Sequence, residues 1–143
     1  MRKLLALTKN NYQHKNLLQL FISSTFGLAS LVLPTFFLTE IKQHDSPLFP
    51  IIATSVNGFS IWSIFLLAIS GFIISLFSKI EGWKIGLSTM ALFPIMTIIE
   101  MIVDSSSHTL FPFEFIFYAL LTIPSIIGAY IAKGIMTFII PKS

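Results

Sequence analysis

The sequence contains no cysteine and very little charge. Only 10% of its 143 residues are charged, whereas soluble domains carry about a quarter charged residues, so the composition excludes that class. The lack of cysteine excludes disulfides, thiolate metal sites and a cysteine nucleophile. The chain is instead 55% hydrophobic with a mean hydropathy of +0.87. Such a composition is typical of a protein whose side chains face lipid as well as one another.

Motifs of common catalytic sites are also lacking. The sequence has no H-E-x-x-H, G-x-S-x-G, Walker or Rossmann glycine pattern. His14, His44 and His108 all lie outside the long apolar stretches, which argues against haem ligation within a bundle and leaves the serines without a recognisable base. We therefore expect a protein that is not an enzyme, and we assign no catalytic residue, cofactor or metal ligand.

Four apolar stretches have the length of membrane-spanning helices, and the first two of them carry no charge. A bilayer requires about 20 apolar residues, and the pattern predicts spans at about 17–39, 59–78, 85–103 and 113–132. We expect an all-α integral membrane protein, with a basic segment at 1–16 followed by a single domain at 17–140 in which four helices pack as a bundle.

Three details of these spans stay open. The uncharged stretch before the second span begins at Ser46, so one long tilted helix is an alternative; its part 48–56 is also apolar enough to enter the membrane interface. Pro94 predicts a kink in the third span. Residues 134–140 are still apolar, so the end of the fourth span is open.

The N-terminus also resembles a secretory signal, because a basic segment precedes an apolar one. Gly27 and Ala29 are small residues at cleavage-like positions, yet the apolar stretch continues through 31–38. A signal peptide ends sooner. We therefore expect an uncleaved anchor.

The basic residues predict the orientation. Four spans place both termini and the 79–84 turn on one side of the membrane. Cytoplasmic loops are rich in lysine and arginine, so we expect both termini in the cytoplasm and the protein in the plasma membrane. We interpret the net charge of +3 in this way rather than as nucleic-acid binding, because no aromatic-interleaved basic patch accompanies it. The predicted cytoplasmic side carries Arg2, Lys3, Lys9, Lys15, Lys79, Lys84, Lys133 and Lys142, and the other side carries Lys42 alone.

Small residues recur at helical spacing within the spans. Residues four apart share a helix face, and small residues there allow helices to approach closely. We interpret these faces as helix-packing surfaces, the alternative being the lining of a substrate path. The candidate packing pairs are Ser23 and Gly27, Gly71 and Ser75, and Gly128 and Ala132.

Acidic residues gather on the predicted non-cytoplasmic side. Glu100 and Asp104 are one turn apart on the third span, His108 follows in the loop, and Glu114 opens the fourth span. Glu100 lies about one turn inside the boundary, where a carboxylate is a candidate functional group, and Lys42 is its expected partner. These residues form a candidate ion or proton site. The alternative is that they are solvated in the headgroup layer, or that they suit a helix N-terminus.

Two functions fit these patterns. The first is a non-enzymatic accessory, regulatory or immunity-type partner of another membrane protein, in which Gly71→Leu or Gly128→Leu should abolish association. The second is a small oligomeric transporter or ion- or proton-binding protein that uses the outer carboxylates. The expected partners are the lipid bilayer and either another membrane protein or a second copy of the chain, with no nucleic acid. The sequence favours the first function.

Overall fold

The computed structural model describes residues 2–38, 48–103 and 111–139, and all regular secondary structure within them is α-helical. This confirms the expected all-α fold for the described residues. The helices are α1 (Arg2–Leu38), α2 (Pro50–Asn57), α3 (Ile61–Phe77), α4 (Gly82–Thr89), α5 (Leu92–Val103) and α6 (Phe111–Ile139).

Three stretches are long and apolar enough to cross a membrane: Gln13–Leu38 in α1, Gly82–Val103 across α4 and α5, and Pro112–Ile139 in α6. The number rises to four if α2 and α3 count as one span, which is bent by 103° between them. These are the helices of a multi-pass membrane protein.

The bend between α2 and α3 has a local cause. Helix α2 ends at Asn57 with Gly58 as its C-cap, and α3 starts afresh with Ser60 as its N-cap. The Ser60 hydroxyl accepts a hydrogen bond from the Ser63 N–H, and the Ser63 hydroxyl accepts one from the Ser60 N–H, both at 3.4 Å. This reciprocal pairing satisfies donors that a new helix leaves open. The alternative of one long tilted helix is therefore wrong.

Pro94 lies just after a break in the third span, where the sequence predicted only a kink. Proline has no N–H to donate to the carbonyl four residues earlier, which here belongs to Met90. The chain forms a tight turn instead, in which the N–H of Phe93 donates to the Met90 carbonyl at 3.2 Å. The hydroxyl of Thr89 bonds back to the Gly86 carbonyl at 2.6 Å, which also favours bending. The third span is thus two helices, α4 and α5.

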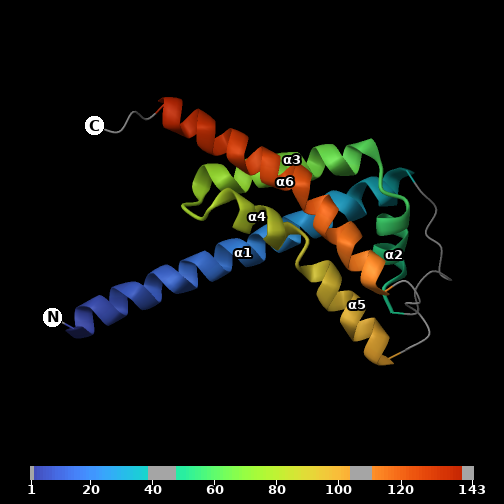
Figure 1. The fold of residues 1–143 in the computed structure, drawn as a ribbon, viewed down its shortest axis with the longest axis horizontal. Helices are drawn as coiled ribbons and strands as arrows, with labels where there is room; N and C mark the ends of the chain where they lie inside the picture. The colour runs from blue at the N-terminus through green and yellow to red at the C-terminus, as the bar shows by residue number, and fades with distance from the viewer. Residues whose placement is uncertain (1, 39–47, 104–110, 140–143) are drawn as a thin grey trace.

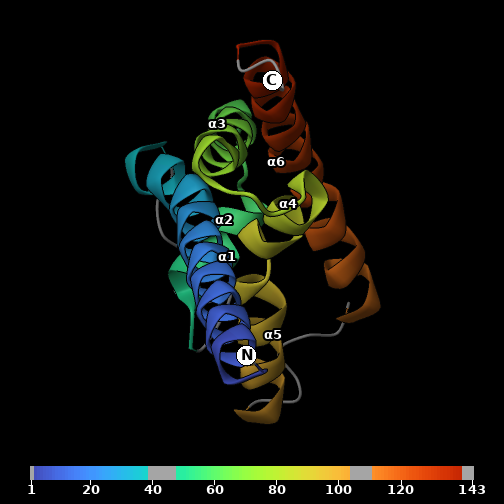
Figure 2. The same cartoon turned by 90° about the vertical axis from the view of Figure 1, so that its left-hand side faces the viewer.

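The helices define two ends of the molecule (Figure 1). The start of α1, the end of α6 and the turn between α3 and α4 lie at one end, here called the terminal end. Helix α2, the last turn of α5 and the first turn of α6 lie at the other, here called the α2 end. Figure 2, which looks from the terminal end, shows α4 between α1 and α6. Helices α3 and α6 make the most extensive pairing in the fold.

The described residues of the basic segment 1–16 are helical. Helix α1 is continuous from Arg2 and carries this segment as its first turns. Figure 1 shows these turns extending away from the other helices at the terminal end.

Burial in the described side chains matches a lipid environment. Large apolar residues such as Ile102 and Phe138 are exposed, as expected where lipid is the outer solvent. The interior combines two apolar clusters with many buried serines and threonines, whose hydroxyls mostly bond to backbone carbonyls. The clusters are Leu31, Leu67, Met90, Phe93, Tyr118 and Leu121, and Ile74, Ile80, Ile85 and Ala129.

Candidate functional site

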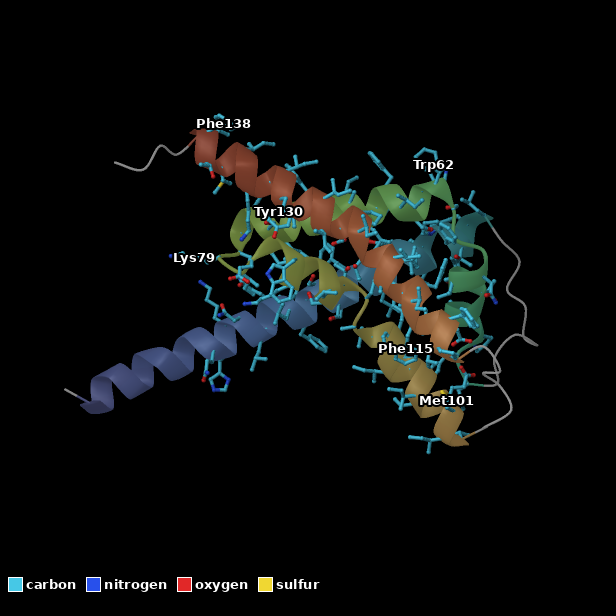
Figure 3. The ribbon with its side chains drawn as sticks, viewed as in Figure 1. Trp62, Lys79, Met101, Phe115, Tyr130 and Phe138 are labelled. Carbon is cyan, nitrogen blue, oxygen red and sulfur yellow. The ribbon has the colours of Figure 1, made fainter. Side chains whose placement is uncertain are left out.

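Two of the four residues predicted to form an ion or proton site lie in the described part of the chain. Glu100 is in the last turn of α5 and Glu114 in the first turn of α6. Figure 3 shows their neighbours Met101 and Phe115 at the α2 end. Outside the described residues lie Asp104, His108, the expected partner Lys42, and Glu40, His44 and Asp45 of the first loop.

Glu100 is buried where α2 begins. Its side chain is only 3% exposed, and its Oε1 accepts a hydrogen bond from the backbone N–H of Leu48 at 3.2 Å. Leu48 precedes Pro50, the first residue of α2, by two positions. A helix N-terminus has unpaired N–H groups and the positive end of the helix dipole, so a negative charge is stabilised there. The carboxylate thereby joins α5 to α2.

A second polar pair lies close to Glu100. The hydroxyls of Thr97 and Tyr118 are 2.9 Å apart and share one hydrogen bond, which either can donate. Both side chains are buried. Thr97 and Glu100 are three residues apart on α5, so they share a helix face, while Tyr118 reaches this face from α6.

These three residues line a small hollow between α2, α5 and α6, here called the Glu100 cavity. Its volume is about 30 Å³, and a cavity of about 10–15 Å³ already holds a water molecule. It therefore has room for one or two waters or a small ion. Its remaining walls are apolar and come largely from α2: Phe49, Ile52, Ala53, Val56 and Met96.

The cavity offers a carboxylate, an aliphatic hydroxyl and a phenol. Oxygen ligands suit protons and hard cations. No group of three or more His, Cys, Asp or Glu residues within the described ranges is arranged to hold a metal ion. The described polar side chains that line the cavity thus offer oxygen ligands alone.

Glu114 lines a different hollow, here called the Glu114 groove. Its volume is about 430 Å³, far larger than the Glu100 cavity. Val56 at the end of α2 lines both spaces, so the two hollows adjoin there. The structure therefore brings Glu100 and Glu114 to the same end of the molecule but into separate spaces. The groove is lined by Val56, Asn57, Phe59, Phe113, Glu114 and Phe117.

The candidate packing residues of α3 and α6 face one another within this chain. A Cβ at Gly71 would overlap the backbone of Ser125, and a Cβ at Gly128 would overlap the backbone of Ala68. Ser75 donates from its hydroxyl to the Ala129 carbonyl at 2.9 Å. These glycines permit the close intramolecular crossing of α3 and α6. Bulky substitutions there would disturb the fold itself and so do not test association with a partner.

The remaining packing candidates are also buried inside the chain. A Cβ at Gly27 would overlap the backbone of Thr89, where α1 crosses α4. One turn earlier, the Ser23 hydroxyl donates to the Ile85 carbonyl at 3.1 Å. Ala132 is fully buried on α6. The small-residue surfaces are thus used for internal contacts.

Charged side chains also contact one another at the terminal end, in the turn between α3 and α4. Lys84 lies 3.0 Å from a Glu81 carboxylate oxygen, and the Trp83 indole N–H donates to Glu81 at 2.8 Å. The hydrogen bond and charge of Lys84, followed by the Trp83 bond, hold the pKa of Glu81 below its ordinary value. The Lys133 ammonium reaches from α6 to the Ile80 carbonyl. This turn is tied to α6 by a basic side chain.

Sequence reasoning missed the role of α2. Thr97 and Tyr118 lie on the polar faces that the helical spacing indicates, so they could have been grouped with Glu100. The return of residues 48–56 over Glu100 had only a weak signal, namely an apolar stretch ending at Asn57-Gly58.

Comparison with protein-family models, with curated proteins and with solved structures finds no match for this chain.

Proposed function

We propose that this protein is a small, non-enzymatic membrane protein that binds a proton or a monovalent cation at Glu100. The observation that carries the proposal is the burial of this carboxylate in an apolar helix, with α2 folded over it. A carboxylate within a membrane span is rare and usually functional.

The broken helices support this proposal over a purely structural role. Helices α2 and α3 are separated by a 103° bend, and α4 and α5 by a turn before Pro94. In many transporters, discontinuous helices expose backbone groups near an ion or substrate site. Here the backbone N–H of Leu48, just before α2, meets the Glu100 carboxylate.

Binding the ion would change the contact that holds α2. Oε1 of Glu100 accepts the Leu48 hydrogen bond, and a proton or cation bound at that atom would compete with this bond. The Thr97 and Tyr118 hydroxyls can reorient within the Glu100 cavity to receive the ion. Loading and release of Glu100 would therefore be coupled to the position of α2.

The proposed membrane arrangement has four crossings, with α2 and α3 forming the bent second one. Eight lysines and arginines belong to the terminal end of such an arrangement, against one on the other side, so both termini are cytoplasmic in this proposal. The plasma membrane is the proposed location. Four helices are few for a transport path, so transport would require an oligomer of the chain.

Flux in reconstituted vesicles tests the proposal. Purified protein is reconstituted into lipid vesicles that contain a pH-sensitive dye. A potassium diffusion potential across the vesicle membrane then drives proton or sodium movement. We expect flux with the unchanged protein and its loss in Glu100→Gln, which keeps the shape of the side chain. Glu81→Gln is the matched control, because Glu81 is an exposed carboxylate at the opposite end. Equal flux from Glu100→Gln and the unchanged protein would refute a role for this carboxylate.

A second candidate function is the accessory role of a partner protein. The observation that favours it is an entirely apolar groove of about 400 Å³ between α1 and α3, whose lining includes Leu33, Trp62 and Leu66. Side chains of a neighbouring membrane helix fit such a surface. Affinity purification from mild detergent should then recover a stoichiometric partner that Leu33→Trp removes, while Ile131→Trp, at an exposed site on α6, retains it. Recovery of the partner with both variants would contradict this role of the groove.

A further inference from the structure

The Glu114 groove combines one carboxylate with aromatic walls. Phe59 precedes α3, and Phe113 and Phe117 lie on successive turns of α6. The Phe59 and Phe117 rings meet edge to face with centroids 5.4 Å apart. Glu114 lies between the two α6 phenylalanines, and Asn57 adds the only other polar side chain among the described lining residues.

The walls of this groove are held by the fold. The hydrogen-bonded pair Ser60 and Ser63 fixes the start of α3 directly after Phe59. The close crossing of α3 and α6 at Gly71 and Gly128 fixes the two helices relative to each other. The groove is therefore a defined space, and its volume of about 430 Å³ is within the range of small-molecule sites, about 300–1,000 Å³.

The lining selects a class of ligand. A carboxylate favours a positive charge, and aromatic faces attract cations through their quadrupole. The remaining apolar area disfavours a small hydrated ion, which would have to lose its water. A metal ion is also disfavoured, since Glu114 is the one carboxylate among the described lining residues. These features together favour a cation that carries its charge inside an apolar body.

We propose that the Glu114 groove binds a hydrophobic organic monocation of the quaternary ammonium or phosphonium class. The Glu114 carboxylate balances its charge, and Phe59, Phe113 and Phe117 contact its apolar groups. A zwitterionic lipid headgroup fits less well, because its phosphate would meet no basic residue among the described lining residues. This site is separate from the Glu100 cavity and goes beyond the function proposed for it.

Equilibrium binding of radiolabelled tetraphenylphosphonium to the purified full chain tests the proposal. The probe has a permanent charge, so its binding does not depend on its own protonation. We expect saturable binding at about one probe per chain, displaced by unlabelled probe. Loss of the opposing charge in Glu114→Gln should weaken binding by about tenfold or more, and Glu114→Asp should retain most of it. Glu81→Gln, which removes an exposed carboxylate at the terminal end, should bind as the unchanged protein does.

A second variant keeps the test decisive if Glu114→Gln does not fold. Phe113 is 67% exposed, so Phe113→Leu should leave the fold intact while weakening binding several-fold through loss of an aromatic face. Unsaturable binding, or equal binding by Glu114→Gln and the unchanged protein, would overturn the proposal. Displacement of the probe by short-chain phosphatidylcholine at equal concentration would overturn the choice of occupant in favour of a lipid headgroup.

Discussion

Replacing Gly128 with alanine tests the crossing of α3 and α6, which holds the walls of the Glu114 groove. The added Cβ would overlap the backbone carbonyl of Ala68, and a helix backbone cannot move aside as a flexible side chain can. Overpacking a tight interior costs about 1–3 kcal/mol. Because the obstacle is backbone, we expect the free energy of unfolding to fall by about 2–3 kcal/mol, in the upper part of that range.

Gly134 on the same helix provides the matched control. Nothing lies within 4 Å of a Cβ at Gly134, so Gly134→Ala should leave stability unchanged or slightly higher, since alanine favours helix more than glycine does. Unfolding by sodium dodecyl sulfate in mild detergent, followed by the fluorescence of the two tryptophans, measures both variants. Equal stability of Gly128→Ala and Gly134→Ala would refute the close crossing.

Three further predictions use the same preparation. Among the described residues, the buried Ser125 hydroxyl has no hydrogen-bond partner, so Ser125→Ala should keep or raise the free energy of unfolding. Ser75→Ala should lower that free energy by about 0.6 kcal/mol, because it removes an interhelical hydrogen bond. A larger loss in Ser125→Ala than in Ser75→Ala would contradict this assignment of the two hydroxyls. The pKa of Glu81 is lowered in the folded protein. The stability that its ionised carboxylate contributes through Lys84 and Trp83 is therefore present above the ordinary glutamate pKa and is lost as the pH falls through the lowered pKa. A small stability advantage over Glu81→Gln should therefore disappear in acid, and an advantage that grows in acid would contradict the assignment. The chain has no cysteine, so a single cysteine can be introduced either at Lys79, which Figure 3 shows at the terminal end, or at Asn57 at the α2 end. An impermeant maleimide should label these two variants from opposite sides of the membrane. Labelling of both from one side would contradict the four crossings.

The fold could be predicted where the signal is composition and length. Apolar stretches of about 20 residues indicate spans, and α1, the α4–α5 stretch and α6 lie where those stretches fall. The predicted start of the second span at 59 falls close to the start of α3, but the pattern left one long helix open because residues 46–78 are uncharged throughout. Hydropathy measures transfer into lipid and contains no information about direction, so a 103° bend leaves it unchanged. The Ser60 cap was the available local signal.

The candidate site could be predicted only in part, because spacing along one helix does not show what faces it. Glu100 was identifiable as a carboxylate in an apolar helix. Its contact with Leu48 joins positions 52 residues apart, which no helical spacing reveals. Glu114 was grouped with Glu100 because both approach the 104–110 loop, yet the two carboxylates line different hollows that share Val56. Tertiary packing, rather than local sequence, decides that division.

Infrared difference spectroscopy of the carboxyl groups tests the proposed role of Glu100 most directly. Membranes containing the protein are exchanged between acidic and neutral buffer, and between sodium and a large inert cation, while the carboxyl bands are recorded. The proposed site predicts an ion-dependent carboxyl band that is present in the unchanged protein and in Glu114→Gln and is absent in Glu100→Gln. A band that persists in Glu100→Gln, or a Glu100 carboxyl that does not respond to either exchange, would contradict a proton or cation site at Glu100.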